Sequence, residues 1–212
     1  MLKAFNLPTL FVTVTFSEKW SQYEEILRRA GGNSLPSNHP WEAVEYYYER
    51  LYQLRKNFWS KPHLTGFGKL LESVVRCEFQ LRQAIHSHML FWTQKSIPEM
   101  IARNYIRADV PDPDLEPELY ELVMGHQIHT CKPHLCGRSM TDPESRPCRK
   151  GFPQPLSEET KYVEGELRYI YRRTCEQDRY VVPYEPRLLL IWGAHINVQY
   201  VTSCGLSKYV TK

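Results

Sequence analysis

The sequence lacks any apolar run long enough to cross a bilayer, which takes about 20 residues. Its longest apolar run is LLLIWGA, residues 188–194, which has only the length of a strand. The apolar N-terminal residues are interrupted by Asn6 and Pro8, unlike the core of a signal peptide. We therefore expect no membrane partner and an intracellular, reducing compartment, in which the six cysteines act as thiols or metal ligands rather than in disulfides.

An excess of charge of one sign is also absent, because 27 basic residues stand against 24 acidic ones and the net charge is only +3. Such a balance permits nucleic-acid binding without indicating it, since a nucleic-acid-binding domain typically carries a larger or clustered positive charge. The hydrophobic content of 42% and the charged content of 24% are typical of a globular chain. The length of 212 residues suffices for one large domain, or for a domain with a small insert.

Hydrophobic periodicity predicts a strand and two helices in the first 60 residues. Residues 9–16, TLFVTVTF, alternate apolar side chains with a face that carries hydroxyl groups, which is typical of a β-strand. Residues 17–32 form an expected helix with Ser17 as its N-cap. Residues 41–59 have apolar and aromatic side chains at helical spacing, and the tyrosines among them favour packing on a sheet over base stacking.

The second half of the chain is less regular. Residues 107–123 contain three prolines within seven positions, Pro111, Pro113 and Pro117, so we expect no regular structure there. Strands and connections are expected between residues 156 and 201, and a helix is expected to begin at Thr202 or Ser203.

The stretch CEFQLRQAIHSHMLFW (residues 77–92) has the pattern of a β-hairpin in which two histidines share a face. Side chains alternate along a strand, so His86 and His88 lie in one row. The preceding strand places Glu78 and Gln80 in a common row as well. Two imidazoles together with a carboxylate or an amide, converging from paired strands, can bind a metal ion.

The segment from residue 126 to residue 155 is rich in Cys, His, Pro and Arg and poor in aliphatic residues. It cannot build a hydrophobic core of its own. A structural zinc ion with four ligands would supply the folding free energy that this segment lacks. Our preferred ligand set is His129, Cys131, Cys136 and Cys148, with His126 and His134 as alternates.

Four stretches, in order, resemble the Rep endonuclease domain of Helitron transposases, a group of HUH endonucleases. LPTLFVTVTFSEKW is similar to the first motif of the family, and EFQLRQAIHSHMLFW to the second, in which two histidines bind the catalytic metal. CRKGFP resembles the end of the Cys/His insert of the family. DRYVVPYEPRLLLIWGAHINVQYVTSCGLSKYVTK is similar to the third region, which ends in a tyrosine motif.

The resemblance implies an α+β fold with a central antiparallel sheet, the H-x-H strand in its middle, helices on one face and a tyrosine-bearing helix over the metal. Residues 1–125 and 156–212 would then be two parts of one nuclease domain. Residues 126–155 would be its Cys/His-rich, zinc-binding insert.

The resemblance also implies the activity, which is that of a metal-dependent endonuclease and strand transferase acting on single-stranded DNA. Such enzymes form a 5′-phosphotyrosine link, initiate rolling-circle transposition in the nucleus and are usually fused to a C-terminal DNA helicase. The resemblance assigns His86 and His88 as metal ligands and Tyr209 as the nucleophile, flanked by Lys208 and Lys212.

This sequence departs from the family pattern at two places. In the family a second tyrosine follows the position of Lys212, so we expect a nuclease domain truncated before that residue, with one tyrosine of the pair. Ala84 and Ile85 stand where the family often has a glycine or proline before the first histidine, which does not affect the chemistry.

A divalent ion is needed because a tyrosine hydroxyl, with a pKa of about 10, is a poor nucleophile at neutral pH. An ion bound at the scissile phosphate makes the phosphorus more reactive. We expect activity with Mg²⁺ and at least equal activity with Mn²⁺, because histidine ligands shift the preference toward later metals. Glu78 is the preferred third ligand, because it supplies a charged oxygen, and Gln80 is the alternative.

Two other functions remain open from the sequence. The chain may be read as a non-catalytic, zinc-stabilised module that binds nucleic acid, with His86 and His88 in structural roles. It may also be read as a zinc hydrolase that uses water in place of Tyr209. A covalent protein–DNA adduct forms only in the strand transferase.

Overall fold

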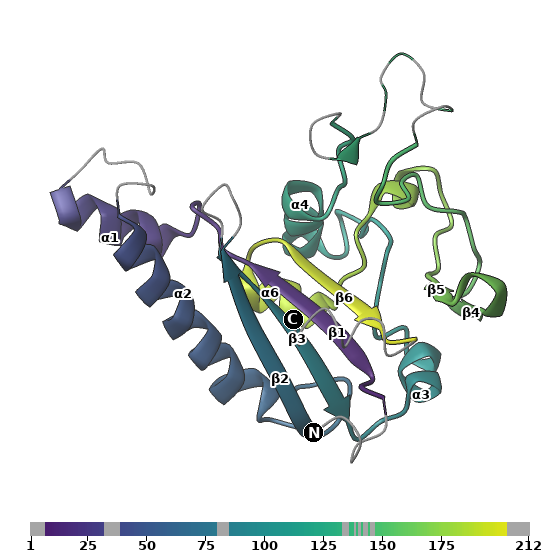
Figure 1. Cartoon of the computed structure of the whole chain (residues 1–212), viewed down its shortest axis with the longest axis horizontal. Coiled ribbons are helices and arrows are strands. Elements are labelled where there is room, and N and C mark those ends of the chain that lie inside the picture. The colour runs from purple at the N-terminus through teal and green to yellow at the C-terminus, as the bar shows by residue number, and fades with distance from the viewer. Residues whose placement is uncertain are drawn as a thin grey trace.

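The computed structural model describes residues 7–31, 39–79, 85–132, 136–137, 139, 141, 144 and 147–202. A four-stranded antiparallel sheet lies at its centre, with strand order β2-β3-β1-β6. The strands are β1 (Leu10–Thr15), β2 (Leu70–Phe79), β3 (Ile85–Thr93) and β6 (Ile196–Tyr200). β3 lies between β2 and β1, so the H-x-H strand is internal to the sheet, as expected (Figure 1).

The two faces of the sheet differ in chemistry because its side chains alternate. On β1, Leu10, Val12 and Val14 are buried in the main hydrophobic core. Thr13 and Thr15 lie on the opposite face and are partly exposed. β6 shows the same alternation, with buried apolar residues separated by partly exposed amides. We call the face that carries the threonines the polar face.

Helices cover the apolar face of the sheet. They are α1 (Ser21–Gly31), α2 (Pro40–Leu54), which continues into the π-helical turn η2 (Arg55–Trp59), and α6 (Pro186–Trp192). The hydroxyl oxygen of the buried Tyr47 of α2 lies within hydrogen-bond distance of the backbone oxygen of Val14, at 3.1 Å, and of Ser87 Oγ, at 2.7 Å. These contacts fix α2 against both central strands, β1 and β3. The α+β fold expected from the sequence is confirmed.

Smaller elements lie on the β6 side of the sheet (Figure 1). They include the helix α4 (Pro117–His126) and a two-stranded sheet of β4 (Lys161–Val163) and β5 (Arg168–Ile170). The remaining elements are α3 (Ile97–Ala102), η3 (Glu164–Glu166) and η4 (Gln177–Tyr180). None of the helices in the described ranges is long and apolar enough to cross a membrane.

Two sequence-based expectations about helices were wrong. The apolar run LLLIWGA is mostly helix α6 rather than a strand. Glu185 caps this helix by accepting a hydrogen bond from the backbone N–H of Leu188, at 2.6 Å, and Gly193 ends it with a positive φ of 65°. Pro117, expected to exclude regular structure, begins α4, because proline lacks an N–H that the first turn leaves unpaired in any case.

The start of α1 also differs from the expectation. Ser17 does not cap the helix, which begins four residues later at Ser21. Ser17 Oγ instead accepts a hydrogen bond from the backbone N–H of Lys19, at 3.2 Å, within a turn. The buried Trp20, next in the chain, donates from Nε1 to the backbone oxygen of Trp192, at 3.0 Å, and joins this turn to the end of α6.

Trp192 is the side chain of α6 on which the helix layer depends, and we predict that Trp192→Ala destabilises the fold by about 3–5 kcal/mol. The indole is 1% exposed, packs edge-on against Trp20 and Tyr47, and donates from Nε1 to the backbone oxygen of Thr15, at 2.8 Å. Chemical denaturation measures the loss. Ile191→Ala, one residue earlier and 47% exposed, is the control and should cost less than about 1 kcal/mol. Equal losses for the two variants would contradict this assignment.

Candidate functional site

The two histidines of the H-x-H motif converge on the polar face of the sheet. His86 and His88 are separated by one residue on β3, so their rings point to the same side. Their Nε2 atoms lie 3.0 Å apart, and the rings meet edge to face. His86 is 5% exposed, so the pair is largely shielded from solvent.

Glu78 completes the group from the neighbouring strand β2. It lies directly opposite His86 in the antiparallel register. Its Oε2 atom is 3.5 Å from Nε2 of His86 and 3.8 Å from Nε2 of His88. Arg76, two residues earlier on the same face, holds the other carboxylate oxygen with an Nε–Oε1 distance of 3.0 Å. Arg76 also lies opposite His88, so it brings a positive charge to the rim of the site.

β1 supports the histidines from the other side. Thr13 lies opposite His88 in the register, and its Oγ1 is 3.0 Å from Nδ1 of that ring. Phe11 stacks on His88 with 5.4 Å between ring centroids. Thr13 and Phe11 therefore orient the His88 ring. The Nδ1 atom of His86, in contrast, is buried and has no hydrogen-bond partner in the part of the chain that the structure describes.

Burial lowers the pKa of His88, and the nearby His86 lowers it further, while the Glu78 carboxylate acts in the opposite direction. The lowered pKa favours a neutral imidazole near pH 7. A neutral imidazole has the free lone pair that a metal ligand requires.

The donor atoms of His86, His88 and Glu78 fit a single divalent ion. One ligand atom from each residue lies within 4.8 Å of the others. Ligand atoms bound about 2.0–2.2 Å from one ion are separated by roughly 3.0–3.4 Å, close to the distances found here. With Nδ1 of His88 at the threonine hydroxyl, its Nε2 atom is the ring nitrogen that faces His86 and Glu78, an arrangement typical of metal-binding histidines, whose other ring nitrogen contacts a supporting group.

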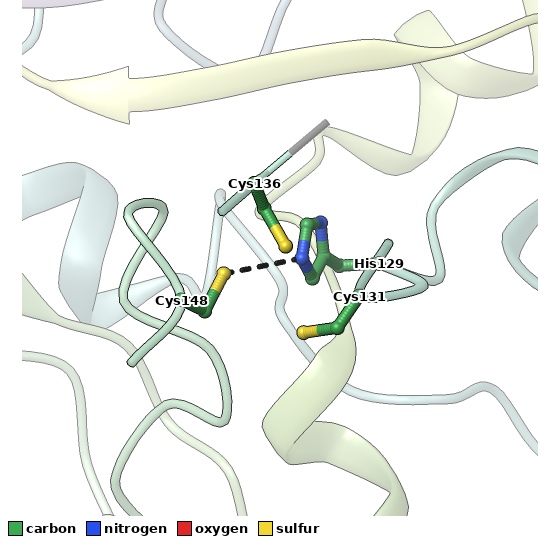
Figure 2. A group of neighbouring side chains, drawn as sticks. All are labelled: His129, Cys131, Cys136 and Cys148. Atoms are coloured by element: carbon green, nitrogen blue, oxygen red, sulfur yellow. Dashed lines mark hydrogen bonds between the residues drawn. The ribbon is translucent and has the colours of Figure 1, made fainter. Parts of the chain in front are cut away.

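A second group of potential ligands lies in the Cys/His-rich segment. The side chains of His129, Cys131, Cys136 and Cys148 point toward one another (Figure 2). His129, Cys131 and Cys148 lie in loops, and Cys136 has a helical conformation. One ligand atom from each lies within 4.8 Å of the other three, and Sγ of Cys148 is 3.3 Å from Nε2 of His129. These four residues are the set that the sequence favoured for zinc.

The group is attached to the rest of the fold by its neighbours. The backbone N–H of His129 donates to the backbone oxygen of Tyr180, at 2.8 Å, and the His129 ring stacks on Phe152, with centroids 4.3 Å apart. The backbone N–H of Arg149 donates to the backbone oxygen of Cys136, at 2.9 Å. Three thiolates and one imidazole form a typical tetrahedral zinc set, so the donor chemistry fits that ion.

One described candidate, the alternate zinc ligand His126, is not part of either group. His126 lies at the end of α4, where its backbone oxygen accepts a hydrogen bond from Nδ1 of His195, at 2.8 Å. The other candidates lie outside the described residues: Gln80, His134, Lys208, Tyr209 and Lys212. Their proposed roles remain predictions.

Sequence reasoning missed Thr13 and Arg76 as residues of the site. A signal was present for each of them. Thr13 belongs to the face of hydroxyls predicted for the first strand, and Arg76 precedes Glu78 by two residues in the same row. Only the strand register shows that both lie opposite His88.

The part of the chain that contains His86, His88 and Glu78 matches a known family. Residues 1–91 match the family model of the Helitron helicase-like domain at the N-terminus. The match covers β1, β2 and the part of β3 that carries both histidines. No curated protein matches the chain.

The Cys/His group predicts a tightly held structural metal, which we expect to be about one zinc ion per purified chain. Cys148→Ser should lose this zinc and lower the thermal unfolding midpoint by roughly 10 °C or more, because the coreless segment depends on it. Elemental analysis and thermal melts measure both effects. Cys175→Ser, an exposed cysteine outside the group, is the matched control. A zinc-free parent chain of ordinary stability would contradict the prediction.

The contact between Thr13 and His88 predicts an effect on metal affinity, which can be measured without any catalytic activity. Thr13→Val removes the hydroxyl at Nδ1 of His88 and should weaken Mn²⁺ binding about 10–100-fold, the usual cost of losing such a supporting contact. Isothermal titration with Mn²⁺ measures the affinity. Thr15→Val makes the same change one row away, opposite His86, and should have a smaller effect. Equal losses in both variants would show that the contact to His88 has no special role.

Proposed function

We propose that this chain, which carries a Helitron helicase-like N-terminal domain, is a metal-dependent endonuclease and strand transferase acting on single-stranded DNA. The observation that carries the proposal is the convergence of His86, His88 and Glu78 on one face of a sheet, within the segment that matches the family. A trio of two imidazoles and one carboxylate supplies only part of the coordination shell of a divalent ion, so the ion could also bind a phosphate.

Each residue of the site has a distinct part in this proposal. His86, His88 and Glu78 hold Mg²⁺ or Mn²⁺, which when bound acts as a Lewis acid toward the scissile phosphate. Arg76 provides a positive charge beside His88 and offsets the charge of the phosphodiester. Thr13 and Phe11 keep the His88 ring in its orientation.

Tyr209 is the proposed nucleophile. Its hydroxyl oxygen gives up its proton and attacks phosphorus, the bond from phosphorus to the 3′ oxygen breaks, and the 3′ oxygen takes up a proton and leaves as a 3′ hydroxyl. The product is a 5′-phosphotyrosine, which keeps the energy of the phosphodiester. A 3′ hydroxyl of another strand can then displace the tyrosine without ATP, which suits strand transfer in rolling-circle transposition.

The chain length permits this role for Tyr209. The described part of the chain ends at Thr202, just after β6, and Tyr209 follows seven residues later. Seven extended residues span up to about 25 Å, and a helix of the same length about 10 Å. The histidines lie on β3, two strands or roughly 10 Å from β6, and Thr202 is five residues beyond Asn197, the β6 residue in the row of His88, which adds roughly 17 Å along the strand. The separation is therefore about 20 Å, which seven extended residues can span. Lys208 and Lys212 would accompany the tyrosine and contact the phosphate.

The wider context follows from the same proposal. Single-stranded DNA is the partner, because a nucleophile must approach one phosphate in line and a duplex backbone restricts that approach. A C-terminal helicase domain in the full-length protein would supply the single strand, and the reaction would take place in the nucleus. The Cys/His group would stabilise the insert rather than take part in the chemistry.

The decisive prediction concerns Tyr209→Phe, which should eliminate the covalent adduct while DNA binding persists. The test uses random-sequence single-stranded oligonucleotides labelled at the 3′ end, incubated with Mn²⁺ and analysed on denaturing gels. The labelled fragment stays on the protein, because the link is to its 5′ phosphate. Tyr162→Phe, a partly exposed tyrosine on β4, should form the adduct normally.

A second arm of the test removes the metal ligands. The double variant His86→Ala, His88→Ala should neither cut DNA nor form the adduct, although Tyr209 is intact. An adduct that maps to another tyrosine would show that the nucleophile is assigned wrongly. Cleavage by the parent chain without any adduct would instead identify a hydrolase that uses water.

A further inference from the structure

A cavity of about 860 Å³ lies beside the histidine site, on the β6 side of the polar face. One wall is formed by Asn197 and Gln199 of β6, and another by His129 and Cys136 of the Cys/His group. β5 contributes Tyr169. This volume is within the usual range for a site that holds a small organic group.

The strand register places the cavity next to the metal ligands. Thr13 pairs with His88 on one side and with Asn197 on the other, so these three residues form one row across β3, β1 and β6. Neighbouring strands are about 4.8 Å apart, so Asn197 lies roughly 10 Å from His88 along this row. Phe11 likewise separates Leu90 from Gln199 in the next row.

The lining has the chemistry of a site for a base with its phosphates. The described residues that line the cavity include no acidic side chain and three basic ones, Lys150, Arg168 and Arg173. Arg173 is buried and donates hydrogen bonds to the backbone oxygens of Asp178 and Val181, so its guanidinium group stabilises the local fold. Lys150 and Arg168 are both exposed, but Arg168 is paired with Glu166 and Gln154, so Lys150 is the residue available to a phosphate.

Amides and rings complete the lining. The Oδ1 atom of Asn197 is buried and has no hydrogen-bond partner among the described residues. A buried amide without a partner costs free energy unless it is paired with a ligand. Tyr169 and Phe152 offer aromatic surface at the cavity, and a nucleobase can stack on such a ring.

We propose that this cavity binds one unstacked base of the DNA strand whose phosphate lies at His86 and His88, with the amide of Asn197 reading the edge of that base. The inference rests on the proposed function and adds a specificity-determining site to it. It also gives the Cys/His group a second role, because His129 and Cys136 form a wall of the base site as well as stabilising the insert.

The test measures binding of four single-stranded 12-mers, dA12, dC12, dT12 and an abasic strand of the same length, without added Mg²⁺ or Mn²⁺. A homopolymer presents the same base in every register, so the cut sequence need not be known. The parent chain should prefer one of the three bases by about tenfold, the discrimination that one good amide–base pair provides. Asn197→Ala should reduce this preference to less than about threefold and leave abasic binding unchanged.

Two matched variants separate base reading from other effects. Lys150→Ala should weaken all four strands by a similar factor, because a phosphate contact carries no sequence information. Asn57→Ala makes the same substitution as Asn197→Ala on η2, away from the polar face, and should change nothing. Asn197→Asp keeps the shape of the side chain, so it replaces Asn197→Ala if that variant fails to fold, and should also alter the base preference.

The outcomes distinguish this inference from the proposed function. An unchanged base preference in the folded Asn197 variants overturns the inference, and so does a parent chain that binds the abasic strand as tightly as every homopolymer. Tighter binding of a free deoxynucleoside monophosphate than of the 12-mers would also overturn it, by showing a mononucleotide site. Failure of the proposed function appears separately, as the absence of a covalent adduct with the parent chain and Mn²⁺.

Discussion

β3 pairs with its two neighbours in a register that sets Glu78 opposite His86 and sets both Thr13 and Arg76 opposite His88. A shift of one residue in either pairing would move the side chains of the shifted strand, Thr13 on β1 or Glu78 and Arg76 on β2, to the opposite face, because the period of a strand is two. The buried apolar residues on the other face prevent such a shift, since they would have to enter solvent. The hydrophobic core therefore fixes the geometry of the metal ligands.

The Cys/His-rich segment follows a different principle, because it contributes few side chains to that core. Four potential ligands come together, and backbone hydrogen bonds connect His129 to Tyr180 of η4 and Cys136 to Arg149, the neighbour of Cys148. Their position beside β6 makes the segment a wall of the cavity on the polar face. A metal bound there would thus stabilise both the insert and the surface proposed to bind DNA.

The sequence predicted the features that depend on local patterns. Alternation alone placed His86, His88 and Glu78 in adjacent rows, and the lack of aliphatic residues indicated that His129 and its partner cysteines act together. The sequence-based prediction failed for α6, because a continuous apolar run has no periodicity that distinguishes a strand from a helix. The N-cap Glu185 is the feature that favours the helix. The cavity could not be predicted from the sequence, because its walls come from segments about 70 residues apart in the chain that meet only in the folded protein.

The aromatic helices offer an alternative surface for DNA through the exposed rings of Trp41, Tyr48 and Tyr52, but the other rings of this layer are engaged in packing. Tyr47 is fully buried, Tyr46 stacks on Tyr23, and Trp20 packs under the guanidinium of Arg50, 4.2 Å from the ring centroid. These rings are used for packing the helix layer on the apolar face. The potential metal ligands of β2 and β3, the positive charge of Arg76 and the cavity at β6 all lie on the opposite face. A strand that crosses this polar face from β2 toward β6 meets the proposed site of cleavage first and the proposed base site next, so one short path would serve both chemistry and specificity.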